Sequence, residues 1–442
     1  MIDKKAPIDY LTRPVKSIFS NEATIGVLLF LSAVAAMVVA NSSWGGEWYE
    51  HLWEKEITIS FDDKEFGLTL HYLINDGLMA IFFFLVGLEI KREVIAGELS
   101  TWKKASMPIA AAIGGMAVPA LIFIAFNPGE TGKGWGIPMA TDIAFALGLI
   151  NLVRRRIAPS VKVFITSLAV VDDIGAVLVI AFFYTSSFDV DQLYIAGGAW
   201  VLLMAANRLG VRNVFFYTFI GISGIWVAFF YSGIHPTIAG ILLAFTIPAK
   251  YRITKDQFTD RLKILYRKYL KTTTIDTDFN TEREDYLLKG IRSAGDDART
   301  PLQKIEHGLF PFVYFVIMPI FAFANAGLKI EDNFWAGLVE PIGLGIIFGL
   351  IVGKFVGISL VSRLMVAMGL AQLPEGSSWK QIYGTSILAG IGFTMSLFIS
   401  ELAFVNREYA ESAKSAILVA SILAGVIGLL VIRFTNSKKP ML

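Results

Sequence analysis

Apolar stretches about as long as a bilayer is thick recur along this 442-residue chain. A helix that crosses a membrane needs roughly 20 mostly apolar residues. Inside a bilayer, only helices and closed barrels satisfy all of their backbone hydrogen bonds. Only 17% of the residues are charged, whereas a soluble domain carries about a quarter. We therefore predict an all-α polytopic membrane protein, with residues 1–442 forming one membrane domain.

About twelve spans fit this length requirement. They are expected near residues 23–41, 71–90, 105–126, 137–152, 160–184, 191–207, 213–231, 234–249, 308–329, 339–362, 380–404 and 412–433. The fourth span is short and begins irregularly around Pro138, and Gly390 and Gly392 weaken the eleventh. Most of the 39 Lys and Arg residues lie in loops on the side of the two termini. Basic loops stay cytoplasmic, so both termini are predicted to be cytoplasmic.

Two of the loops have recognisable patterns. EITISF and FGLTL flank DDKE and alternate like two short strands, which predicts an external β-hairpin. Its exposed edge could pair with a second copy of the chain, or the hairpin could lie alone on the surface. The loop 251–306 is predicted to be cytoplasmic, and Phe258, Leu262, Leu265 and Tyr269 recur in it at helical spacing. It is either a basic helix on the membrane surface or a solvated connector.

Two adjacent acids near the middle of the fifth span are the most informative residues of the chain. Asp172 and Asp173 lie within ITSLAVVDDIGAVLVIAFF. A carboxylate at the centre of a bilayer costs a few kcal/mol, so such residues usually have a function. The pair is predicted to bind cations or protons, although basic neighbours could simply neutralise it. Adjacent helical residues point about 100° apart, which argues against an aspartic-protease dyad.

The irregular start of the fourth span supplies further oxygen atoms. Thr141 and Asp142 follow Pro138, and irregular backbone at membrane depth must be buried in protein or line a cavity. The freed carbonyl groups and the Thr141 hydroxyl are hard ligands that suit Na⁺ or Li⁺. Asp142 could also compensate the positive N-terminal ends of two half-helices.

A lysine lies within the tenth span. Lys354 is next to a row of glycines at i, i+4 spacing, which admits close packing of another helix: Gly345, Gly349, Gly353 and Gly357. An unpaired ammonium group at this depth is costly, so Lys354 should pair with an acid. Asp172 and Asp173 are the first candidates, and Asp142 is the next.

Other ionisable residues near the ends of spans have two interpretations each. Asp76 is either an interfacial acid or helix cap, or a residue that helps cations reach the site. His235 is more often a hydrogen-bonded interfacial residue than a pH sensor. At the cytoplasmic ends of spans two and nine, the pattern alone indicates ordinary solvated charges: Glu89, Lys91, Arg92, Glu93, Glu306 and His307.

Seven motifs together make the chain resemble the bacterial NhaA-type Na⁺/H⁺ antiporters. In order they are LINDGLMAIFFFLVGLEIKRE, PMATDIAFALG, TSLAVVDDIGA, GIHPTIAG, PIFAFANAG, VGKFVGI and GIGFTMSLFIS. The resemblance covers residues 17–433 except the loop 251–304, which is longer than is usual in the family. It implies inverted repeats, spans three to five against ten to twelve, with broken spans four and eleven crossing at the midplane.

The resemblance also implies which parts of the chain carry the ion and which form the dimer. Residues 105–184 and 339–433 would form the ion-carrying core, and residues 23–90 and 191–329 the part that forms a homodimer through the hairpin. Asp172 and Asp173 would bind the ion, Thr141 and Asp142 would belong to the crossing, and Lys354 would pair with the acids. The pH-response residues would be Glu89, Arg92, Glu93 and Glu306, with His235 at the outer end. Phe310 stands where the family often has a second histidine, which puts the pH profile in question.

These observations predict a secondary transporter rather than an enzyme. We expect exchange of cytoplasmic Na⁺ or Li⁺ for external protons across the bacterial cytoplasmic membrane, electrogenic and regulated by pH. No cofactor and no nucleic-acid partner are expected. A passive monovalent cation channel is the alternative, because it also needs acids along a pore; broken helices in two inverted halves favour the transporter.

Overall fold

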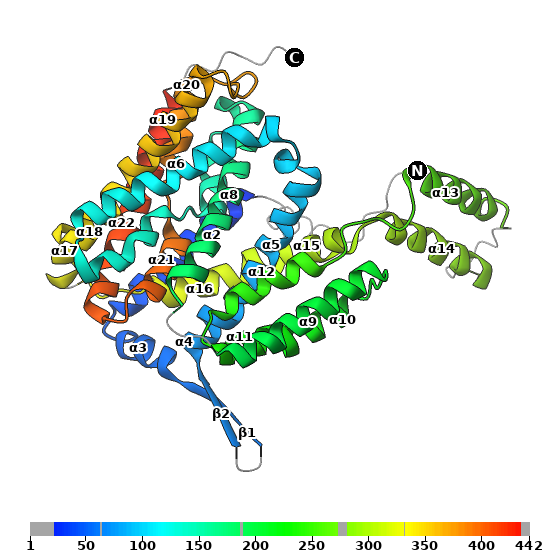
Figure 1. The fold of residues 1–442 in the computed structure, drawn as a ribbon, viewed down its shortest axis with the longest axis horizontal. Coiled ribbons are helices and arrows are strands. Elements are labelled where there is room, and N and C mark those ends of the chain that lie inside the picture. The colour runs from blue at the N-terminus through cyan, green and yellow to red at the C-terminus, as the bar shows by residue number, and fades with distance from the viewer. Residues whose placement is uncertain (1–21, 62–63, 186–188, 273–280, 331, 435–442) are drawn as a thin grey trace.

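The computed structural model describes residues 22–61, 64–185, 189–272, 281–330 and 332–434, and helices dominate them (Figure 1). Both chain ends, whose cytoplasmic placement was predicted, and Asp62 and Asp63 of the predicted hairpin turn lie outside these residues. A helix is present at each of the twelve places expected. The apolar segments that the sequence predicted as spans are therefore helical, but they differ in length and regularity.

Eight continuous helical runs are long and apolar enough to cross a membrane within the part of the chain that is described. They are α2 (Glu22–Ala40), α4–α5 (Leu70–Ala96), α6 (Trp102–Phe126), α8 (Pro159–Phe183), α10–α11 (Val214–Ser232), α15–α16 (Pro301–Asn325), α18–α19 (Pro341–Ala367) and α22 (Arg407–Arg433). Two further predicted spans, the fourth and the eleventh, are interrupted, and each forms a bent pair of segments. A 3₁₀ segment, Gly129–Met139, meets α7 (Ile143–Leu152) at 44°, and α20 (Trp379–Leu388) meets α21 (Phe393–Ala403) at 45°.

Two predicted spans fall short of a full crossing by length or composition. The helix α12 (Pro236–Thr246) has only 11 residues, and α9 (Val190–Arg208) is 19 residues long but carries polar side chains at both ends. The described residues thus contain eight to ten candidate spans, against the about twelve that were predicted. Shorter elements of the helical body are α3 (Gly46–Glu54), α17 (Asp332–Val339) and the 3₁₀ turns Glu98–Ser100 and Arg154–Arg156.

Four of the long runs contain a π-helical segment, which the sequence did not predict. These segments are Leu73–Leu78, Gly221–Trp226, Val313–Ile317 and Gly349–Gly353. The third follows Pro311, which lacks the N–H that a regular helix would use. Glycines begin and end the fourth. π-Helical segments are often found at functional sites, and the first of these contains Asp76.

The predicted glycine row on the tenth span brings two helices into backbone contact. A Cβ atom on Gly357 of α19 would lie 2.1 Å from the carbonyl oxygen of Gly114 in α6. Further along the same side, a Cβ on Gly353 would lie 2.8 Å from the Cα of Pro119 in α6. The first spans of the two predicted repeats therefore pack directly against each other, as the broken second spans also do.

The predicted β-hairpin is confirmed. Strands β1 (Glu56–Phe61) and β2 (Lys64–Thr69) are antiparallel, with Glu56 opposite Thr69. The hairpin projects from the end of the helical body that carries α3 and α4 (Figure 1). Because it is a two-stranded sheet within the described chain, its outer edges have no further strand beside them.

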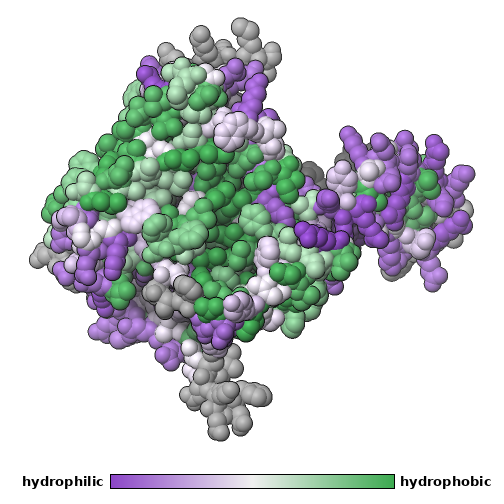
Figure 2. All heavy atoms as spheres, in the orientation of Figure 1, coloured by the Kyte–Doolittle hydropathy of each residue, from purple (hydrophilic) through white to green (hydrophobic). Residues whose placement is uncertain are grey.

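The loop 251–306 contains a helical hairpin that stands away from the body (Figure 1). Its helices are α13 (Lys255–Tyr269) and α14 (Glu282–Ala298). Leu265 of α13 faces Gly290 of α14, whose Cβ position would be 3.1 Å from it, and Arg261 pairs with Asp297 at 3.0 Å. The apolar stripe predicted for α13 therefore packs on its neighbour, and the face of the pair seen in Figure 2 is mostly hydrophilic, although Ile264 and Tyr286 are exposed. This favours the connector over a membrane-surface helix.

The ninth span begins earlier than predicted. Helix α15 starts at Pro301, behind a capping box formed by Thr300 and Gln303, instead of near residue 308. Glu306 and His307 consequently lie inside the helix. Glu306 is only 3% exposed, so it is not the solvated helix end that the sequence pattern alone suggested.

Candidate functional site

The two bent pairs cross at their breaks. The N–H of Asp142 donates to the carbonyl oxygen of Ile391 at 2.7 Å, and the Ser396 hydroxyl donates to the carbonyl oxygen of Ile137 at 2.8 Å. Each broken segment therefore supplies hydrogen-bond partners for backbone groups that the other has freed. The crossing is buried, since Asp142 is 1% exposed. Such irregular backbone is stable at membrane depth only with partners of this kind.

Asp142 caps two helices at once. One carboxylate oxygen, Oδ1, accepts the N–H of Phe145 in the first turn of α7 at 2.9 Å. The other, Oδ2, accepts the N–H of Thr394 at the start of α21 at 3.2 Å and also the Thr394 hydroxyl. A carboxylate is stabilised at a helix N-terminus by the free N–H groups and by the helix dipole. Asp142 therefore contacts both half-helix N-termini, as the sequence suggested, whereas Thr394 was not foreseen.

Lys354 pairs with Asp172. The Lys354 ammonium group donates to Asp172 Oδ2, and the two side chains are 0% and 1% exposed. The Thr141 hydroxyl lies 2.7 Å from the same carboxylate oxygen and 2.9 Å from the carbonyl oxygen of Ala389. The other oxygen, Asp172 Oδ1, is buried and has no hydrogen-bond partner among the described residues. Sequence reasoning left three acids as partners for Lys354, and the geometry selects Asp172.

Asp173 is in a different position. It is 4% exposed, and among the described residues none forms a hydrogen bond or ion pair with its carboxylate. A buried carboxylate normally has such partners, because burial without them is costly. The site therefore contains one engaged acid, one unengaged acid and one lysine. Its oxygen atoms are hard ligands of the kind that suit Na⁺.

A cavity of about 440 Å³ lies on the predicted cytoplasmic side. It is lined by Glu89, Arg92 and Glu306, and it reaches Val170, which is three residues before Asp173. Arg92 pairs with Glu306 and, at 3.1 Å, with Glu93. The four charged residues that the resemblance grouped together thus meet in space around this cavity. Phe310, in place of the second histidine, also lines it.

Asp76 and His235 lie apart from that cavity. Asp76 is 8% exposed, and its Oδ1 is 3.7 Å from Nδ1 of His235, the residue before α12. His235 therefore does not join the cytoplasmic group of charged residues. Asp76 and His235, each of which had two interpretations from the sequence, are therefore neighbours in space.

Comparisons with known proteins agree with these observations. The protein-family model described as Na⁺/H⁺ antiporter 1 matches residues 16–432. The chain is 46% identical to Na⁺/H⁺ antiporter NhaA 2 of Syntrophotalea carbinolica over 98% of its own length and 99% of that protein. This chain belongs to the NhaA family of Na⁺/H⁺ antiporters. It is a multi-pass membrane transporter and not an enzyme.

Other members of the NhaA family match over similar lengths. The antiporter NhaA of Oleidesulfovibrio alaskensis is 44% identical, covering 97% of this chain and 95% of that one. The antiporter NhaA of Christiangramia forsetii is 42% identical, covering 99% of this chain and 98% of that one.

A solved structure of the sodium proton antiporter MjNhaP1 from Methanocaldococcus jannaschii at pH 8 aligns with 93% of this chain and 92% of its own, at 12% identity and a TM-score of 0.45.

Proposed function

We propose that this NhaA-family antiporter exchanges cytoplasmic Na⁺ or Li⁺ for external protons at Asp172 and Asp173. We place it in the bacterial cytoplasmic membrane with both termini in the cytoplasm. The observation that carries the proposal is the buried Asp173 carboxylate, which has no hydrogen-bond or ion-pair partner in the described part of the chain, beside an Asp172 that pairs with Lys354. A site with one free negative charge at membrane depth has a strong tendency to take up a cation or a proton.

The proposed cycle alternates access to one site. With the site open to the cytoplasm, the acids lose their protons and bind Na⁺ together with the Thr141 hydroxyl oxygen and freed backbone carbonyls. Lys354 stabilises Asp172 while no ion is bound. The ion-carrying part, residues 105–184 and 339–433, then moves against the part formed by residues 23–90 and 191–329. External protons displace the ion, and the protonated carrier returns.

Charge balance makes the exchange electrogenic. If two acids release more than one proton for each monovalent ion that they bind, each cycle carries net charge across the membrane, and the membrane potential drives it. In liposomes with a fixed Na⁺ gradient and the voltage clamped by valinomycin, Na⁺ flux should change the lumen pH. A constant lumen pH would indicate a channel and contradict the exchange.

The charged residues beside the cytoplasmic cavity are proposed to control its pH response. Arg92 connects Glu93 with Glu306, so protonation of either acid would change the charge around the route to Asp173. His235 and Asp76 are proposed to act at the outer end, with Asp76 helping cations reach the site. The free strand edges of the external hairpin are proposed to pair in a homodimer.

The central test is Na⁺-induced proton movement in everted membrane vesicles. Asp173→Asn keeps the shape of the side chain but removes its charge and its titratable proton, so exchange should be lost while the protein still inserts. Asp191→Asn is the matched control, because Asp191 is an exposed acid near the start of α9 and should be dispensable. Na⁺-dependent proton flux that persists in Asp173→Asn would contradict the assignment.

A further inference from the structure

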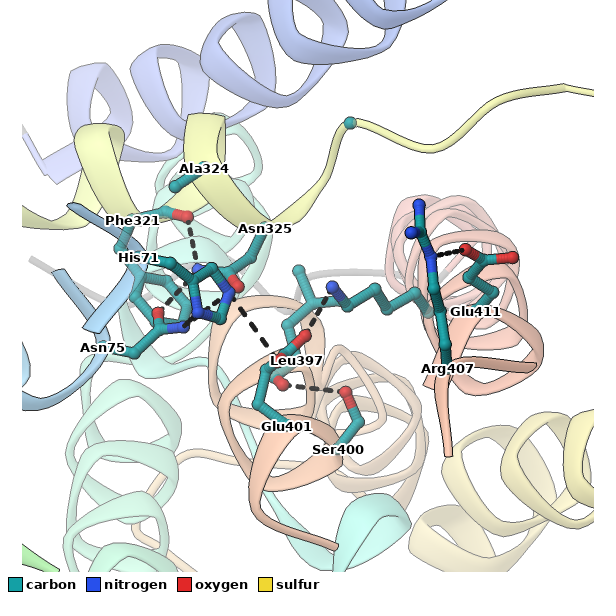
Figure 3. Close-up of polar contacts among 12 residues, drawn as sticks. His71, Asn75, Phe321, Ala324, Asn325, Leu397, Ser400, Glu401, Arg407 and Glu411 are labelled. Atoms are coloured by element: carbon teal, nitrogen blue, oxygen red, sulfur yellow. Dashed lines mark hydrogen bonds and ion pairs between the residues drawn. The ribbon is translucent and has the colours of Figure 1, made fainter. Parts of the chain in front are cut away.

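A second polar cluster, drawn in Figure 3, lies at the hairpin end of the molecule and lines a cavity of about 940 Å³. Glu401, near the C-terminal end of α21, pairs with Lys414 of α22 and lies 3.7 Å from Nε2 of His71 in α4. All three residues line the cavity. The sequence did not predict this cluster, because its members come from three separate spans and no local pattern brings them together.

His71 is held in position by neighbouring spans. The side-chain nitrogen of Asn75, one helical turn later, lies 3.0 Å from Nε2 of His71. The Asn75 carbonyl oxygen accepts a hydrogen bond from Asn325 of α16 at 2.9 Å, and Asn325 also donates to the carbonyl oxygen of Phe321 at 3.1 Å (Figure 3). His71, Asn75 and Asn325 therefore form one polar layer. Glu401 contacts this layer through His71.

An aromatic layer lies beneath the polar one. Phe398, one turn before Glu401 on α21, packs against Phe83 of α5 with ring centroids 5.4 Å apart and against Phe321 of α16 at 6.3 Å. All three rings are at most 1% exposed. Thr394, which binds Asp142 at the crossing, lies seven residues before Glu401, or roughly 10 Å along a helix. Both layers thus separate the external cavity from the crossing.

We propose that the contact between His71 and Glu401 is an external latch that holds these two layers closed. The proposal rests on the proposed function, in which His71 belongs to the part that stays still and Glu401 to the ion-carrying part. External protons can reach Asp173 only if the layers separate, and α21 must then carry Glu401 away from His71. The charged groups that face His71 are Glu401, Lys414 and Asp76 of its own span.

A second charged contact bridges the same two parts at this end of the described chain. Glu50 of α3 lies 3.0 Å from Arg407 of α22, but their side chains are 41% and 74% exposed. Exposed pairs contribute little to the energy of closure. The His71 and Glu401 side chains are 39% and 20% exposed, against 41% and 74% for Glu50 and Arg407, so screening weakens the contact between His71 and Glu401 less. The contact between His71 and Glu401 is therefore the stronger candidate for the latch.

The test uses a thiol placed within the closed layers. The chain has no cysteine, so Ser400→Cys introduces a single reactive group. Ser400 is 0% exposed and its hydroxyl donates to the carbonyl oxygen of Leu397, so the nearly isosteric thiol should remain shielded. A membrane-impermeant maleimide added outside proteoliposomes should label it only when the layers open. The labelling rate then measures how often the external side opens.

Glu401→Gln removes the negative charge that His71 faces at 3.7 Å and should raise the labelling rate about fivefold, the upper end for a partly exposed charged contact. His71→Gln should raise it similarly, and the double variant should not exceed the larger single effect, because both changes remove one contact. His71→Lys keeps a permanent cation opposite Glu401 and should slow the labelling. The matched control is Glu411→Gln: Glu411 lines the same cavity but pairs with Arg407 within one helix, at 2.9 Å, and should have no effect.

Equal labelling rates for Glu401→Gln and Glu411→Gln would overturn the latch. Slower labelling in His71→Lys would support it independently of folding, because misfolding exposes a buried thiol and makes labelling faster. Faster labelling in His71→Lys would count against the latch. Exchange that survives Asp173→Asn would contradict the proposed function without altering these rates, so the two failures are distinguishable.

Discussion

Removing the Lys354 ammonium group is the sharpest test of the buried site. Lys354→Met keeps a long apolar side chain but leaves the Asp172 carboxylate without its counter-charge. Asp172 would retain one contact, from the Thr141 hydroxyl at 2.7 Å, and its Oδ1 is already without a partner in the described chain. Breaking a fully buried ion pair on one side costs about 3–5 kcal/mol.

The cost should depend on pH, because the unpaired carboxylate can escape by taking up a proton. Protonating a carboxyl group with an ordinary pKa of about 3.9 costs about 4 kcal/mol at pH 7 and about 1.5 kcal/mol at pH 5. At each pH, the variant adopts whichever is cheaper, the unpaired buried carboxylate or its protonated form. Lys354→Met should therefore lose about 3–4 kcal/mol at pH 7 but less than half of that at pH 5.

Thermal unfolding in detergent, compared with the parent protein at both pH values, measures this difference. The matched control is Asp172→Asn combined with Lys354→Met, which removes both charges and should recover most of the lost stability at pH 7. A loss in Lys354→Met that is equal at pH 5 and pH 7 would refute the reasoning. So would a double variant as unstable as the single one.

Three further predictions use thermal unfolding. Thr394→Val removes the hydroxyl that binds Asp142 and should cost about 1.5–3 kcal/mol, whereas Thr385→Val, whose hydroxyl bonds within its own helix, should cost less. Gly357→Ala places a Cβ against the backbone of Gly114 and should cost about 1–3 kcal/mol, whereas Gly295→Ala, which has open space, should be neutral or stabilising. The Lys329 ammonium group lowers the pKa of the Glu50 carboxyl, so this pair stabilises the fold above the ordinary carboxyl pKa and loses its effect as pH falls through the lowered value. Glu50→Gln should therefore lower the melting temperature slightly at pH 7 and have no effect well below about pH 4; an equal effect at both would contradict this.

The elements foreseen from the sequence are those with local signals. Apolar length predicted a helix at each of the expected places, and alternation predicted β1 and β2. The early start of α15 also had a local signal that was overlooked. Thr300, Pro301 and Gln303 form a helix-start pattern, a capping box with proline in the first turn.

The partners within the site had no local signal. Asp172 and Asp173 are adjacent, so the acid that meets Lys354 depends on the rotation of α8 and on the position of α19, which only the packed structure fixes. Glu401 was missed for a related reason: its partner Lys414 lies on the next span, and only the packing of α22 on α21 brings the two side chains together. A sequence shows that buried charges need partners but does not select them.

The double cap formed by Asp142 has a consequence for the charge that the carrier moves. The N-termini of α7 and α21 each bring about half a positive charge, and the single Asp142 carboxylate cancels their sum. The crossing is therefore electrically neutral as a unit. Only Asp172, Asp173 and Lys354 then set the net charge of the moving site, which is −1 when empty, zero with one Na⁺ and +1 with two protons. Under the proposed exchange, the outward and return movements differ by one charge, so the membrane potential would act mainly on the protonated return.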